Sequence, residues 1–270
     1  MARHPNGGDP VYFLSVMSDT VRLFVDAWKL MVGRLPLPTI KEEDGVVSCF
    51  GNVPLFFLNL SIVNRPAETH EELRAFLNAA AGHVASCKYP SGVVLRQDWL
   101  PVGWEHLIDE AGLAPVVPMT GMEADELLPP RHLLPSLDVL RVVDNAMARH
   151  LAELNALAYK MPADAFDCLA NMRLWHTDSC AYVGYLGGHP VTCAAAFPVN
   201  ETVYIALVAT LPEQQGKGYA ETVTRQAVIQ GRRAMRTTRT TLHASDMGVS
   251  VYRGMGFRPG PKMVILAAKQ

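Results

Sequence analysis

Residues 208–220, VATLPEQQGKGYA, constrain the fold of this chain more than any other stretch. A short apolar run that is typical of a buried strand ends at Pro212, a polar turn with two glycines follows, and a helical pattern begins near Gly218. In such a turn, unpaired backbone N–H groups at the N-terminus of the helix, its positive end, point toward the same place. Glycine lets the backbone approach a bound group closely. The stretch therefore predicts an anion site suited to phosphate or pyrophosphate.

Two familiar phosphate-binding loops do not fit this turn. A P-loop requires Ser or Thr directly after its Gly-Lys pair, whereas Gly218 and Tyr219 follow Lys217. A dinucleotide-binding GxGxxG loop requires a third glycine where Glu221 stands, and it belongs to a parallel βαβ unit, whereas hairpin patterns precede the turn here. The loop therefore indicates another class of α/β protein.

The second half of the chain shows strand and helix patterns in a definite order. A strand in LDVLRVVD leads to a helix that Asp144 or Asn145 can cap, and Pro162 marks a second helix start. Two strands joined at Gly187-Gly188 predict a hairpin, and a third strand runs into the glycine turn. A helix to about Met235, the strand TTLHA, the helix MGVSVYRGM and the final strand KMVILAA complete this order.

The first half also mixes strands and helices. Two strand-like runs around Gly51-Asn52 predict a hairpin, and Thr69 with Glu72 three residues later predicts a capping-box helix start. The apolar segment VYFLSVMSDTVRLFVDAWKLMV is interrupted by charged residues, so it predicts an amphipathic helix and no membrane span. Residues 126–136, ELLPPRHLLPS, contain three prolines and predict a linker between domains 1–130 and 137–270.

The glycine turn resembles the acyl-CoA pyrophosphate loop of the GNAT superfamily of N-acetyltransferases. It fits the pattern Q/R-x-x-G-x-G/A, and a second family signature follows as LHASDMGVSVYRGMGF, where Tyr252 precedes Gly256-Phe257. The order of elements in residues 137–270 is also similar to the family's order. The resemblance implies an α/β (α+β) fold with a mixed, mostly antiparallel sheet flanked by helices.

The resemblance also implies where the acetyl-CoA would bind. The strand before the loop would hold the pantetheine arm through its backbone, and the loop would bind pyrophosphate. Ser245 stands in the region where the family often has a pantetheine-binding asparagine. The implied cofactor-binding residues are Val208, Ala209, Thr210, Gln215, Gly216, Lys217, Gly218, Tyr219, Ala220 and Ser245.

Acyl transfer to an amine requires a neutral amine and a proton for the leaving thiolate. Tyr252 occupies the position of the family's tyrosine acid, which makes it the expected catalytic residue; the alternative is a tyrosine that only packs on the core. The general base stays open among Glu201, Tyr204, His243 and a chain of water molecules.

The first half shows a weaker sequence similarity to the same family pattern. GWEHLIDEAGLAPVVPM parallels GVSVYRGMGFRPGPKMV, with Gly112 aligned on Gly256 and Ile108 on Tyr252. The segment NRPAETHEELRAF stands where the loop should be and contains no glycine. The first half is therefore expected to be either a degenerate GNAT-like domain that does not bind CoA or an unrelated α/β domain.

The expected function is acetyl-CoA-dependent N-acetylation of a primary amine by direct attack in a ternary complex. A non-catalytic acyl-CoA sensor is the alternative, and longer acyl donors form a third case. The net charge of −2 argues against nucleic acid as a partner, and the five scattered cysteines are typical of a reduced, cytoplasmic protein without a metal. The expected partner is a small-molecule or peptide amine, no membrane is involved, and homodimer formation stays open.

Overall fold

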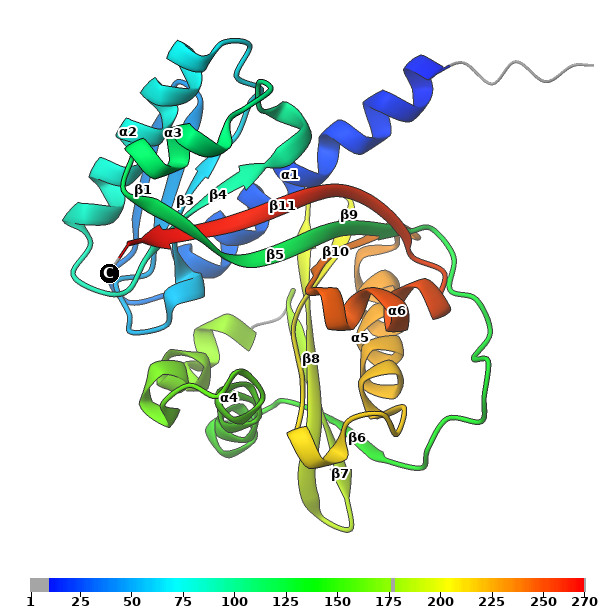
Figure 1. The fold of residues 1–270 in the computed structure, drawn as a ribbon. Coiled ribbons are helices and arrows are strands. Elements are labelled where there is room, and N and C mark those ends of the chain that lie inside the picture. Colours follow the sequence, from blue (N-terminus) through cyan, green and yellow to red (C-terminus); the bar gives the residue numbers. More distant parts are fainter. Residues whose placement is uncertain (1–9, 176–177, 270) are drawn as a thin grey trace, which may run out of the picture.

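The computed structural model describes residues 10–175 and 178–269, and eleven strands in this part of the chain form one mixed sheet (Figure 1). The helices are α1 (Pro10–Gly33), α2 (His70–Ser86), α3 (Glu105–Glu110), α4 (Asn145–Tyr159), α5 (Tyr219–Met235) and α6 (Asp246–Gly254). The strands are β1 (Thr39–Glu43), β2 (Val46–Phe50), β3 (Asn59–Val63), β4 (Gly92–Arg96), β5 (Leu113–Ala124), β6 (Asp138–Arg141), β7 (Cys180–Leu186), β8 (His189–Val199), β9 (Thr202–Thr210), β10 (Thr240–Ala244) and β11 (Arg258–Ala268). Five 3₁₀ turns are η1 (Phe56–Leu58), η2 (Gln97–Trp99), η3 (Ala163–Ala170), η4 (Met172–Trp175) and η5 (Pro212–Gln214).

The strand order shows that the two halves have the same topology. The sheet runs β1-β2-β3-β4-β11-β5-β10-β9-β8-β7-β6. Its only parallel pairs among the described strands are β3 with β4 and β9 with β10, which lie at matching places on either side of the centre. Each half therefore contains a parallel strand pair, a helix and a returning strand in the same order. This confirms the prediction that the first half repeats the fold pattern of the second.

The two returning strands are exchanged at the centre of the sheet. β11 pairs with β4 of the first half, and β5 pairs with β10 of the second half. β5 and β11 also pair with each other along most of their length, and in Figure 1 they cross the molecule together between the two groups of helices. Neither half therefore contains a complete sheet of its own, and the boundary between domains 1–130 and 137–270 stays a prediction.

Helices cover both faces of the sheet. α5 and α6 pack on one face of the second half through a core that includes Val223, Val228 and Phe257, while α2 and α3 cover the first half through Leu73 and Leu107. α1 and α4 lie on the opposite face of the second half, where a third core joins residues of both halves. The mixed, mostly antiparallel sheet flanked by helices confirms the expected fold class.

Local sequence signals account for most element boundaries. Thr69 caps α2 by accepting a bond from the Glu72 N–H at 3.1 Å, and Asp144 caps α4 by accepting from Met147 at 2.9 Å. Gly187 and Gly188 both have positive φ in the β7–β8 turn. No helix in the described residues is long and apolar enough to cross a membrane.

Two expectations about boundaries were wrong in detail. The β2–β3 hairpin exists, but its second strand begins at Asn59, because η1 and an extended loop follow Gly51-Asn52. The helix expected after Pro162 is the 3₁₀ turn η3 rather than an α-helix. β1, with every residue exposed, lacks the apolar alternation by which a strand is recognised in a sequence.

Candidate functional site

The glycine turn connects β9 to α5 as the sequence predicts. Gly216 and Gly218 have φ of +75° and +81°, a region that residues with a side chain rarely adopt. Gly218 is the N-cap of α5, and no side chain caps this helix end. The first backbone N–H groups of α5 are therefore available for an anion, at the positive end of the helix dipole.

The parallel strands beside this turn separate before they reach it. β10 pairs with β9 only from Val203 to Ile205, although β9 continues to Thr210. Leu207 has a φ of +54° within β9, and the register with β8 shifts at this place, so the strand bulges. Beyond Ile205, β9 therefore keeps β8 as a partner on one side and has no strand partner on the side of β10, so the sheet is open next to the loop.

A cavity of about 570 Å³ occupies this opening. It extends from the glycine turn past the separated strands to α6 and the end of α4. The predicted site residues that line it are Val208, Ala209, Thr210, Gln215, Gly216, Gly218, Tyr219, Ala220, Ser245 and Tyr252. Lys217 is the exception, because its Nζ donates to Gln214 Oε1 at 2.8 Å on the outer side of the turn.

Tyr252 lies on α6 with its side chain almost entirely buried. Its ring passes over Gly248, where an added Cβ would come within 2.9 Å of the ring, and it packs edge-on against Phe257 at 5.8 Å between ring centroids. Burial raises the pKa of Tyr252 above its usual range, and the nearby Tyr159 adds to this rise. The hydroxyl is therefore protonated at neutral pH, as a proton donor must be.

Two of the three side chains considered as a base lie together. Tyr204 Oη and His243 Nδ1 share a hydrogen bond of 2.9 Å, and the edge of the His243 ring meets Phe24 of α1. Burial lowers the pKa of His243 to about 3, so the ring is neutral at physiological pH. His243 also lines the cavity, whereas the exposed Glu201 lies in the β8–β9 turn and does not.

Sequence analysis did not identify three further residues that line the cavity. Arg131 and His132 come from the segment between the halves, and nearby Pro135 would lie 3.2 Å from a Cβ on Gly218. Tyr159 is the last residue of α4. The signal for Arg131 and His132 was a pair of basic residue types within a proline-rich linker, and only the folded chain shows that this linker crosses the glycine turn.

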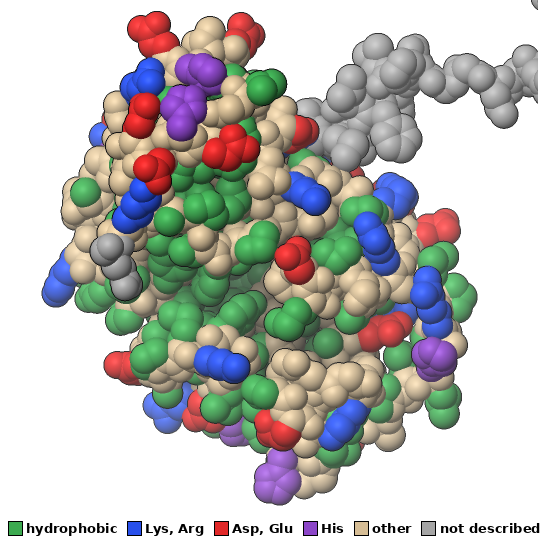
Figure 2. Space-filling model, viewed as in Figure 1, with side chains coloured by type: hydrophobic (Ala, Val, Ile, Leu, Met, Phe, Trp, Pro, Cys, Tyr) green, Lys and Arg blue, Asp and Glu red, His purple; other side chains and the backbone are tan. Residues whose placement is uncertain are grey.

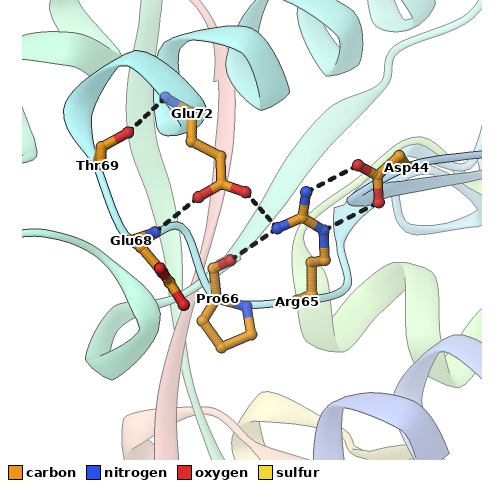
Figure 3. Close-up of polar contacts among 6 residues, drawn as sticks. All are labelled: Asp44, Arg65, Pro66, Glu68, Thr69 and Glu72. Atoms are coloured by element: carbon orange, nitrogen blue, oxygen red, sulfur yellow. Dashed lines mark hydrogen bonds and ion pairs between the residues drawn. The ribbon is translucent and has the colours of Figure 1, made fainter.

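The matching place in the first half is closed by the chain's own side chains (Figure 3). At the start of α2, Glu72 Oε2 accepts from the Glu68 N–H at 2.9 Å, and the same carboxylate pairs with Arg65. Arg65 also holds Asp44 through two bonds of 3.0 and 2.8 Å. Because the Glu68 N–H and then Arg65 stabilise its charge, the pKa of Glu72 is lowered. A carboxylate thus stands at this helix N-terminus, where a phosphate would otherwise be favoured.

An uncapped glycine turn beside separated parallel strands is an arrangement suited to an anion such as a phosphate group. Among the described residues, no three His, Cys, Asp or Glu side chains converge to hold a metal ion. Residues 148–257 match the model of the acetyltransferase (GNAT) family. No curated protein is similar enough in sequence to give a match.

Solved structures share this fold over nearly the whole chain. A GCN5-related N-acetyltransferase from Kribbella flavida has a TM-score of 0.67 at 19% identity, covering 93% of this chain and 96% of that chain. A functionally unknown conserved protein from Staphylococcus epidermidis ATCC 12228 has a TM-score of 0.59 at 19% identity, with 85% and 93% covered. A tandem GNAT protein from the clavulanic acid biosynthesis pathway has a TM-score of 0.50 at 12% identity, with 93% and 94% covered.

The chain therefore carries a GNAT-family domain at residues 148–257, and the fold of GNAT proteins extends over both of its halves. Proteins of this family use acetyl-CoA as the acetyl donor.

The contrast between the two helix N-termini predicts one acetyl-CoA site per chain. Calorimetric titration of the full chain should saturate at one equivalent, and Gly218→Val should weaken all of this binding rather than half of it. The full chain is required, because a fragment ending near residue 130 would leave β4 without β11. A stoichiometry of two would show that the first half binds the coenzyme despite Glu72.

Proposed function

We propose that the chain is an acetyl-CoA-dependent N-acetyltransferase that acetylates a primary amine by direct attack in a ternary complex. The observation that carries this proposal is that one cavity is lined both by the uncapped glycine turn and by Tyr252. The residues fit the coenzyme, because the turn has two glycines in the left-handed region and the linker contributes Arg131. Acetyl-CoA would supply an activated thioester.

Each part of the cavity has its own task in this reaction. The backbone of the turn and Arg131 hold phosphate groups, and the free backbone of β9 beyond Ile205 holds the pantetheine arm. As the amine nitrogen bonds to the thioester carbonyl carbon, the carbon–sulfur bond breaks and Tyr252 gives its proton to the sulfur. The nitrogen loses one proton to solvent, and Tyr252 takes one proton back from solvent, so the protons balance. Val208, Ala209, Thr210 and Ser245 serve the coenzyme in this proposal.

The rival function is an acyl-CoA sensor without turnover. Such a protein needs the turn and the separated strands, but it has no use for a protonated hydroxyl beside the thioester. Tyr252 favours the enzyme, since this residue lines the same cavity as the loop and burial raises its pKa, which keeps its hydroxyl protonated. Longer acyl donors would require space beyond the thioester, and they can be compared directly with acetyl-CoA.

Acetyl-CoA should stabilise the fold, and the complex should release free thiol when a suitable amine is added. Ligand at 100 times its Kd adds about 2.7 kcal/mol to the free energy of unfolding, which raises the melting temperature measurably. NAD and ATP at the same concentration should have much smaller effects. No shift with any acyl-CoA at millimolar concentration would remove the coenzyme assignment, whereas a shift without thiol release from any amine would favour the sensor.

For the partner we propose a small-molecule or peptide amine rather than nucleic acid or a membrane. The charge of −2 supports this choice. All five cysteines are free thiols, which supports a reducing, cytoplasmic location.

A further inference from the structure

The two ends of the cavity differ in their chemistry. Arg131 and His132 line it from the linker, whose Pro135 lies against Gly218 of the glycine turn. Ala206 and Leu207 line it at the β9 bulge, and Tyr159 lines it from the end of α4. The thioester would lie between these ends, beside Tyr252, so the second end is the place that remains for the acceptor.

A row of aromatic rings continues from the acceptor end toward the first half. Phe57 of η1 lies 5.5 Å from Tyr159 between ring centroids, and Tyr159 in turn stacks on Phe166 at 6.2 Å. Trp28 of α1 fixes η1 by donating to the Phe57 carbonyl at 2.6 Å. Figure 2 shows that hydrophobic side chains gather around a hollow between the first half and the part that contains α4. Tyr159 is therefore the apolar wall of the cavity at this place, and Phe57 and Phe166 pack against its ring.

Tyr159 is exposed although it is surrounded by aromatic neighbours. Its exposed fraction is 47% and it lines the cavity, while burial raises the pKa of its hydroxyl, so the ring lies in a recess rather than on an open surface. Tyr159 and Tyr252 line the same cavity. The apolar wall is thus part of the cavity that holds the proton donor of the proposed reaction.

Among the described residues that line the cavity, Arg131 is the only Lys or Arg, and the proposed function assigns it to the phosphate groups. Glu221 is the only carboxylate among the described lining residues, and Arg225 holds it with bonds of 2.8 and 2.7 Å. His243 is uncharged at physiological pH. An additional ammonium or carboxylate on the acceptor would therefore lose its water shell without gaining a partner of opposite charge.

We propose that the acceptor is a monoamine whose amino group is carried on an uncharged, ring-bearing apolar body, and that Tyr159, positioned by its ring contact with Phe57, binds that body. This inference rests on the proposed function and specifies its substrate class. Aromatic rings pair favourably in offset or edge-on arrangements, and they bury a large apolar area. The reaction remains the same: a nitrogen–carbon bond forms, the carbon–sulfur bond breaks, and the thiol keeps the proton from Tyr252.

The test compares 2-phenylethylamine with putrescine, a diamine of similar length, and with glucosamine. With acetyl-CoA, kcat/KM for 2-phenylethylamine should exceed that for either polar amine by at least about tenfold. Tyr159→Ala and Phe57→Ala should each raise the KM for 2-phenylethylamine about tenfold and change the Kd of acetyl-CoA less than twofold. Tyr159→Phe should restore the KM. The matched control is Leu157→Ala, an exposed position on the same helix that does not line the cavity.

Binding is measured separately, by calorimetry of 2-phenylethylamine into the protein saturated with CoA, where no transfer can occur. If 2-phenylethylamine binds, Tyr159→Ala weakens this binding, and acetyl-CoA nevertheless releases no thiol, the acceptor class is supported and the proposed catalysis is wrong. Turnover of putrescine or glucosamine in preference to 2-phenylethylamine would support catalysis and overturn the acceptor class. No binding of 2-phenylethylamine, or KM values unchanged in both alanine variants, would also overturn it.

Discussion

Replacing Tyr252 with phenylalanine should lower turnover by about 10²-fold or more, within the usual range for the loss of a general acid. The substitution removes one hydroxyl and keeps the ring that packs against Phe257 and over Gly248, so the fold should survive. The affinity for acetyl-CoA should change little, because the lost interaction forms in the transition state. The measurement is kcat with a saturating acceptor amine, together with the Kd of acetyl-CoA by calorimetry.

Tyr182→Phe is the matched control for this variant. Tyr182 is a buried tyrosine on β7 that does not line the cavity, so losing its hydroxyl tests the general cost of such a change. Wild-type turnover in Tyr252→Phe would show that water or another group protonates the thiolate. A folded Tyr252→Phe variant that loses affinity and turnover together would instead make Tyr252 a binding residue.

The parts of the site that follow from local chemistry could be predicted from the sequence. The glycine turn, the start of α5 and the position of Tyr252 depend on residues within one strand–turn–helix segment or one short helix. The capping residues Thr69 and Asp144 work in the same way, because a cap acts on backbone groups two or three positions away.

The parts that depend on distant segments could not be predicted. Either β5 or β11 could pair with β4, and the other with β10, because the two strands have comparable apolar patterns. The sequence therefore does not show that they are exchanged. The bulge at Leu207 gives no sign in the sequence, because the residue is neither glycine nor asparagine. Arg131 and Tyr159 reach the cavity only through the paths of the linker and of α4.

Gly218→Val should weaken acetyl-CoA binding by at least about tenfold in a protein that still folds. A β-branched side chain resists the φ of +81° at this position, and its Cβ would lie 3.2 Å from Pro135 Cδ. It would therefore displace either the turn or the linker that carries Arg131. In both cases the uncapped N–H groups of α5 would lose the geometry that an anion requires. Calorimetry gives the affinity, and circular dichroism with a melting curve shows that the variant is folded.

Gly188→Val separates this local effect from the cost of backbone strain. Gly188 has the same φ of +81°, but it lies in the β7–β8 hairpin turn, where an added Cβ meets no atom within 4 Å. Both substitutions should lower stability through the strained backbone, by about 1–3 kcal/mol each, and only Gly218→Val should reduce the affinity for acetyl-CoA. Equal affinities in the two folded variants would mean that the glycine turn does no more than begin α5, and the phosphate contacts would then have to come from elsewhere in the cavity.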